Sequence, residues 1–74
     1  MVKIRDNLTL KGCRIITGIK AEELAEAAEV TVDTWYKWES GRSYPTAPKM
    51  VKIINFFASK GWAVDISEIN FFNH

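Results

Sequence analysis

The side chains that most often carry covalent or metal chemistry are rare in this sequence. Cys13 and His74 are its one cysteine and its one histidine. One cysteine forms no internal disulfide, and one Cys with one His does not make a structural zinc site. Cys13 falls at an apolar helical position with no His or Asn close to it in sequence, which favours a core role over a nucleophilic one. We therefore expect no enzyme activity, no cofactor and no metal.

Hydrogen-bonding side chains are the remaining candidates for function, and Lys37 is the clearest of them. Trp35 and Trp38 are three residues apart and mark the buried side of a helix, which leaves Tyr36 and Lys37 exposed. An exposed front of this kind can bind the bases or phosphates of a nucleic acid. Tryptophans that stack on the bases of a single strand are the alternative, but their place on the buried side favours a core role.

The elements that position these residues are all expected to be helical. Apolar residues recur at three- and four-residue steps, turn residues separate the segments, and no stretch has a convincing strand pattern. Asp6 or Asn7 can cap the first helix, and Gly18, Gly41 and Gly61 are natural helix ends. We expect an all-α domain of five helices: 8–17, a second from Ala21, Thr31 to Ser40, a fourth from Thr46 to Gly61, and a short fifth from Asp65-Ile66-Ser67-Glu68, before a tail of residues 70–74.

Composition and charge bound the class of protein. The 74 residues are 47% hydrophobic and carry a net charge of +1, which suits one packed domain over residues 1–74. No apolar run approaches the roughly 20 residues of a membrane span, and no signal region follows the N-terminus. Basic residues prevail in segments 1–20 and 37–60, and acidic residues in 21–36. A fold could gather the basic segments on one face, or the charges could be spread over an ordinary solvated surface.

The second and third expected helices, at about 21–40, have the length and spacing of a helix-turn-helix. Many unlike residues in one order then carry a closer resemblance: Leu10-Lys11-x-x-Arg14-x-x-x-Gly18-Ile19-x-x-Glu22-Glu23-Leu24-Ala25-Glu26-x-x-x-Val30-Thr31-x-x-Thr34-x-x-Lys37-Trp38-Glu39-x-Gly41-Arg42-x-Tyr44-Pro45. This stretch resembles the lambda-type phage repressor and Cro family, which overlaps with the xenobiotic-response-element-type bacterial regulators. The resemblance runs from about Leu8 to Ile69.

The resemblance implies a role for each group of residues. Arg14 and Glu39 are expected to tie the first helix to the end of the recognition helix. Core positions are expected at Leu24, Ala25, Val30, Trp35 and Trp38. Base contacts are expected from Val32, Asp33, Thr34, Tyr36 and Lys37. Phosphate contacts are expected from Lys20, Ala21, Thr31, Arg42 and Tyr44.

Several positions depart from the family pattern. Ala21 stands where relatives often have Gln, and Glu29 stands where the turn usually has Gly. A left-handed Glu29 would store strain of about 1–2 kcal/mol. Trp35 stands where relatives have a smaller branched residue, which would set the two motif helices further apart. The front at Val32-Asp33 is less positive than usual.

Three of the expected base contacts have an alternative role. Tyr36 and Lys37 have ordinary solvated surface as their alternative role. Asp33 would contact a base by accepting from cytosine N4; its alternative role is to stabilise the helix N-terminus through the dipole.

The resemblance implies a sequence-specific regulator of transcription, either a repressor or Cro-like, of phage or prophage origin. It would act on an operator in double-stranded DNA as a homodimer, in the cytoplasm of a bacterial host near the nucleoid. The adjacent Phe71 and Phe72 cannot both face inward on a regular element, so they are the expected dimer interface; the alternative is that both fold back onto the core. A protein-binding module, antitoxin-like or an anti-repressor partner, is the alternative function, favoured by the near-neutral charge.

Overall fold

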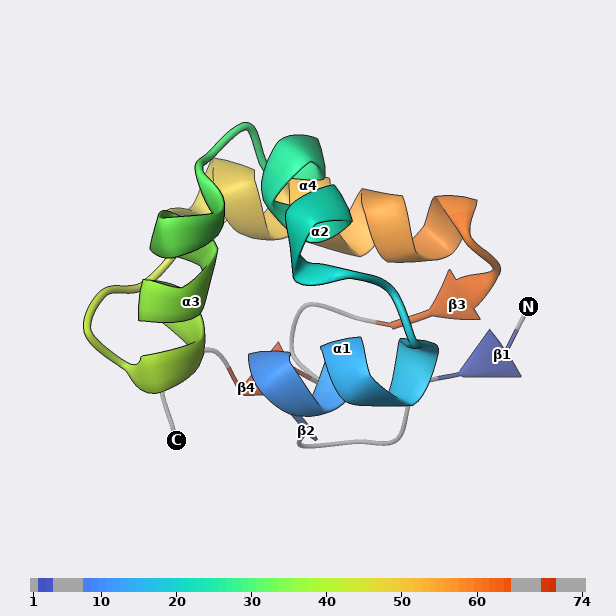
Figure 1. Ribbon diagram of the computed structural model, residues 1–74. Helices are drawn as coiled ribbons and strands as arrows, with labels where there is room; N and C mark the ends of the chain where they lie inside the picture. Colours follow the sequence, from blue (N-terminus) through green and yellow to red (C-terminus); the bar gives the residue numbers. More distant parts are fainter. Residues whose placement is uncertain (1, 4–7, 65–68, 71–74) are drawn as a thin grey trace.

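Four helices make up most of the residues that the structure, a computed structural model, describes: residues 2–3, 8–64 and 69–70 (Figure 1). They are α1 (Leu10–Thr17), α2 (Ala21–Ala27), α3 (Val32–Ser40) and α4 (Ala47–Ser59). Helix α2 packs against both α3 and α4, and α1, which lies below α2 in the view of Figure 1, contacts α3. None of the described helices is long and apolar enough to cross a membrane.

Two short parallel strand pairs join the N-terminal and C-terminal parts of the described chain. The expectation that the chain has no strand is therefore wrong. Strand β1 (Val2–Lys3) pairs with β3 (Trp62–Ala63), and β2 (Leu8–Thr9) pairs with β4 (Ile69–Asn70). Each strand has two residues, which is too short for the alternating pattern that identifies strands in a sequence. The pairing therefore depends on partners about sixty positions away.

The first helix begins two residues later than expected, because Leu8 and Thr9 belong to β2. Thr9 is its N-cap, and the Thr9 hydroxyl accepts from the Gly12 amide at 3.1 Å. The expectation of a cap at Asp6 or Asn7 is therefore wrong. Gly18 ends α1 in the left-handed conformation, with φ 70°, where a glycine has no Cβ to strain the backbone.

The expected fifth helix is not among the four helices of the described residues. Residues 65–68, where it would begin, and residues 71–74 of the expected tail lie outside the described residues. Ile69 and Asn70 form β4 instead of continuing a helix. The chain is therefore mostly helical, with short strands where the sequence pattern predicted a helix and a tail.

The core lies where α2, α3 and α4 meet and is closed by residues of α1 and β4. Four of the five expected core positions are buried, and the fifth, Val30, is partly buried against them. Trp35 and Trp38 contact each other edge to face, with ring centroids 5.8 Å apart. The buried residues are Leu10, Cys13, Ala21, Leu24, Ala25, Ala28, Trp35, Trp38, Ile53, Phe57 and Ile69.

The turn between α2 and α3 is centred on Glu29, which has a φ of 61°. Its amide donates to the Glu26 carbonyl at 3.0 Å, and the Val30 amide reaches back to the Ala25 carbonyl at 2.9 Å. This is the Schellman arrangement, which usually has glycine at the left-handed position. Glu29 also forms an ion pair with Lys52 of α4, and that hydrogen bond lowers the pKa of the Glu29 carboxyl. The turn thereby connects α2, α3 and α4.

Candidate nucleic-acid interface

Helix α3 is held at both ends and on one side, which leaves one long face open. The Thr31 hydroxyl caps its first turn by accepting from the Thr34 amide at 3.2 Å. Gly41, with a φ of 84°, ends the helix. Trp35 and Trp38 bury the inner side against the core. The opposite side of α3 is therefore a rigid, solvent-facing surface.

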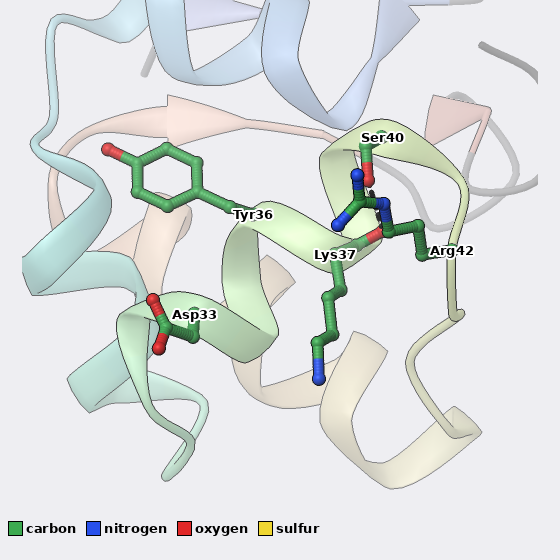
Figure 2. A pocket seen from close by; sticks show the side chains of 5 residues that line it. All are labelled: Asp33, Tyr36, Lys37, Ser40 and Arg42. Atoms are coloured by element: carbon green, nitrogen blue, oxygen red, sulfur yellow. Dashed lines mark hydrogen bonds between the residues drawn. The ribbon is translucent and has the colours of Figure 1, made fainter.

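That open face carries four polar side chains at helical spacing. Asp33, Tyr36, Lys37 and Ser40 follow one another at steps of three, one and three residues, so they share one face. With Arg42 they line a hollow of about 400 Å³ (Figure 2). We call this set of five residues the α3 front. Donors, acceptors and an aromatic ring are thus presented along a single helix.

The charged side chains of the α3 front are available to a ligand. Within the part of the chain that the structure describes, the side chains of Asp33, Lys37 and Arg42 make no hydrogen bond or ion pair. The Ser40 hydroxyl donates to the Lys37 carbonyl at 3.2 Å, a bond that the hydroxyl can exchange for a ligand oxygen. These charged groups are exposed to water and unpaired. A ligand can therefore bind them without first breaking an ion pair within the protein.

Arg14 of α1 and Glu39 of α3 form a two-pronged ion pair behind the α3 front. Arg14 Nε donates to Glu39 Oε2 at 2.6 Å, and Nη2 donates to Oε1 at 3.0 Å. The Glu39 side chain is only 6% exposed. Its hydrogen bond with Arg14 raises the pKa of the Arg14 guanidinium. Glu39 also accepts from the buried Trp35 indole N–H at 2.5 Å. The C-terminal half of α3 is thereby fixed to α1.

Two helices joined by a tight left-handed turn, the second with an exposed polar face, are the arrangement that places a helix in the major groove. The comparison with protein families agrees, because the model of a helix-turn-helix domain matches residues 8–61, more than half of the chain. The chain belongs to the helix-turn-helix domain family. No curated protein and no solved structure matches it. It is thus a DNA-binding protein of the helix-turn-helix class, with α2 and α3 as the motif.

The structure divides the expected base contacts of this helix-turn-helix into two groups. Asp33, Tyr36 and Lys37 belong to the α3 front. Val32 is partly buried and packs against the core, and the Thr34 hydroxyl lies 3.1 Å from that of Thr31. Val32 and Thr34 therefore lie outside the hollow.

Ser40 belongs to the α3 front, although sequence reasoning did not include it. Its position seven residues after Asp33 was the available signal, because residues i and i+7 share a helix face.

The expected phosphate contacts lie at different places around the helix-turn-helix. Lys20 and Thr31 are exposed at the N-caps of α2 and α3, and Arg42 joins the α3 front. Tyr44 is 46% exposed. Ala21 is buried, so its side chain faces the core and only its backbone amide, at the first position of α2, is suited to a phosphate.

Cys13, the candidate nucleophile, is not part of the α3 front. Cys13 is fully buried in the core, and burial raises the pKa of its thiol to about 11, which keeps it protonated at neutral pH. The described residues contain no group of three or more His, Cys, Asp or Glu that could hold a metal ion. Phe71 and Phe72, the expected dimer interface, lie outside the described residues.

The contact between Trp35 and Glu39 was also missed from the sequence. A Trp followed four residues later by a Glu is a pair whose side chains meet on a helix, so the spacing offered the signal. The expectation for Glu39 considered Arg14 alone.

Proposed function

We propose that this protein is a sequence-specific regulator of transcription that places α3 in the major groove of an operator in double-stranded DNA. The observation that carries this proposal is the α3 front, a row of exposed polar side chains along a helix capped at both ends, in which the charged groups of Asp33, Lys37 and Arg42 are unpaired among the described residues. An α-helix fits the major groove, and side chains on its outer face reach the edges of the bases. The mechanism is steric, because the bound protein blocks or redirects transcription.

The finer role follows from the resemblance to lambda-type phage regulators. We assign a repressor or Cro-like role, in a phage or prophage. Arg42, at the end of the α3 front, and Lys20, at the start of α2, would contact phosphates on either side of the groove. Thr31, Tyr44 and the backbone amide of Ala21 would complete the phosphate contacts.

A homodimer would give the selectivity that one recognition helix lacks. Two copies on half-sites about 34 Å apart would double the number of base pairs contacted. Phe71 and Phe72 remain the proposed contact between the copies. Sedimentation of the intact protein and of a Phe71→Ser/Phe72→Ser variant tests this, with a dimer expected only for the intact protein. Identical dimers would place the interface elsewhere, and two monomers at high micromolar concentration would exclude a free dimer.

Selection of duplexes from a random pool, followed by titration at several salt concentrations, tests DNA binding. Lys37→Ala is expected to weaken binding to the selected operator by about 1–3 kcal/mol. Lys60→Ala is the matched control, since Lys60 is exposed at the far end of α4, where its ammonium lies over the Phe56 ring. Equal loss from every sequence, with a salt slope lowered by about one, would make Lys37 a phosphate contact.

A protein-binding module on the same fold is the competing function, and the chain's near-neutral net charge of +1 and the carboxylate of Asp33 on the α3 front favour it. The two functions differ in their response to salt. Binding to duplexes weakens steeply as salt rises, because neutralised phosphates release counterions. If no duplex is enriched and binding to DNA does not depend on salt, the protein-binding function is supported instead.

A further inference from the structure

The α3 front carries two opposite charges one helical turn apart that do not pair with each other. Asp33 and Lys37 are four residues apart, which places their Cβ atoms roughly 5–6 Å from each other. An acid that precedes a base by four residues is the favourable order for an ion pair on a helix. Their charged groups nevertheless point away from each other (Figure 2). Both charges are therefore open to a ligand, one as an acceptor and one as a donor.

The carboxylate of Asp33 restricts what this surface can meet in DNA. A carboxylate only accepts hydrogen bonds, and phosphates repel it. The donors in the major groove are the amino groups of cytosine and adenine. Adenine carries an N7 acceptor beside its amino group, which repels a carboxylate, whereas the major-groove edge of cytosine offers its N4 donor alone. Asp33 is thus suited to cytosine.

Lys37 matches the other half of the same base pair. The guanine opposite a cytosine presents O6 and N7, two acceptors, which a lysine ammonium can bind. Without a cation beside Asp33, guanine O6 and N7 would repel its carboxylate. Arg42 and Ser40, at the C-terminal end of the α3 front, are left for the backbone phosphates.

We propose that Asp33 and Lys37 together recognise one G·C base pair in each operator half-site, Asp33 through cytosine N4 and Lys37 through guanine O6 and N7. This rests on the proposed function, in which α3 lies in the major groove. It adds the chemical identity of a base pair that the operator must contain, and it assigns the acidic residue a positive role in specificity.

Modified bases test the two contacts separately. In the selected operator, each guanine is replaced by 7-deazaguanine, which lacks the N7 acceptor. Each cytosine is replaced by N4-methylcytosine, whose methyl group takes the place of the amino hydrogen in the major groove. At one G·C pair both replacements are expected to weaken binding roughly 5- to 100-fold. Asp33→Ala is expected to abolish the response to N4-methylcytosine there, and Lys37→Ala the response to 7-deazaguanine.

A change of specificity provides the second arm. An Asn side chain can donate and accept at once, which matches N6 and N7 of adenine. Asp33→Asn is therefore expected to shift the preference at that position from cytosine to adenine. Lys60→Ala is the control and should respond to both modified bases as the wild type does. Circular dichroism of each variant shows that a lost contact is not lost folding.

The outcomes separate this proposal from the one on which it rests. If no duplex is enriched, the proposed function fails, and this proposal fails with it. If an operator is enriched but no G·C pair responds to both modified bases, or if the Asp33 variants respond like the wild type, the recognition of a G·C pair is wrong while the proposed function stands.

Discussion

Glu39 is the residue on which the orientation of the recognition helix most depends. Its two oxygens accept three hydrogen bonds, two from Arg14 and one from the Trp35 indole. The carboxylate is almost fully buried and the Arg14 side chain is 22% exposed, so the pair is partly buried, and the buried Trp35 indole relies on Glu39 rather than on water. Loss of Glu39 would leave a partly buried guanidinium without its ion-pair partner and a buried indole N–H without its acceptor.

Glu39→Ala is expected to destabilise the protein by up to about 3–5 kcal/mol, the cost of removing one partner from a buried ion pair, since this pair is partly buried and Glu39 is also the acceptor of the buried Trp35 indole. Glu26→Ala is the control, because Glu26 is an exposed glutamate of α2. Urea melts of the two variants measure the difference. Similar midpoints would show that the Arg14–Glu39 pair contributes little.

Glu29 stores backbone strain at the turn of the motif. Glu29→Gly and Glu29→Ala both remove the ion pair with Lys52, but only glycine relieves the left-handed φ of 61°. We expect the Gly variant to be more stable than the Ala variant by about 1 kcal/mol. Thermal melts provide the comparison.

A comparison of wild type and variants over pH separates the backbone strain from the charge, because only the wild type keeps the Glu29 carboxyl, whereas the Gly and Ala variants differ in the backbone alone. The pKa of Glu29 is lowered in the folded state, so its contribution with Lys52 is present above the ordinary pKa of 4.5 and is lost as the pH falls through the folded value. The difference between the Gly and Ala variants should persist at low pH. A difference that disappears there would contradict a backbone origin.

At the residue scale, the sequence predicted roles that depend on one residue better than roles that depend on how several residues orient a helix. The strain at Glu29 followed from a non-glycine residue at a turn. The placing of Val32 and Thr34 on the exposed front came from family analogy, and the structure instead puts Val32 against the core. Their exposure depends on how far α3 is rotated about its axis, which is set by the two tryptophans and Glu39 together.

Among the elements, α3 and α4 both have threonine at the N-cap but differ in how it is used. Thr31 accepts a hydrogen bond from the Thr34 amide, whereas the Thr46 side chain makes no capping hydrogen bond. Pro48, in the first turn of α4, has no amide hydrogen to satisfy and a fixed φ suited to that position. Of these two threonines, only Thr31, at the start of the recognition helix, therefore uses its hydroxyl as a cap.

Thr31→Ala is expected to cost about 1 kcal/mol of stability, the usual value for a lost N-cap. Thr46→Ala should change stability by much less, because no capping bond is removed. Chemical denaturation of both variants gives the two values. Equal losses would mean that the hydroxyl of Thr31 does not stabilise α3.

Helices were predictable from the sequence because their signals are local. Thr31, Gly41 and the spacing of Trp35 and Trp38 lie within a dozen residues and identify α3 without further information. The strands have no such local signal, since Leu8 and Ile69 become strand residues only through each other. The same reason explains why Ile69 was expected in a fifth helix.

At the scale of the whole molecule, β4 completes the core that the helices begin. Ile69 is buried in the same cluster as Ile53 and Phe57 of α4, although it follows residues 65–68, which lie outside the described part of the chain. Strand β4 is therefore part of the folded domain.

Ile69→Ala is expected to destabilise the protein by about 2–5 kcal/mol, the range for removing a large aliphatic side chain from a core. Val51→Ala is the control, with a side chain on α4 that is 49% exposed, and should stay within about 0.5 kcal/mol of the wild type. The two variants are compared by equilibrium unfolding. A mild effect at Ile69 would mean that β4 lies outside the cooperative unit.

The parallel strand pairs also set an order for folding during synthesis. The ribosome releases the chain from its N-terminus, so all four helices emerge while β1 and β2 still lack their partners at residues 62–63 and 69–70. Contacts between distant residues must also overcome the larger entropy of loop closure. The helix-turn-helix, whose contacts are local, can therefore assemble on a nascent chain, whereas the strand pairing just before α1 must wait for residues 69–70 to leave the ribosome.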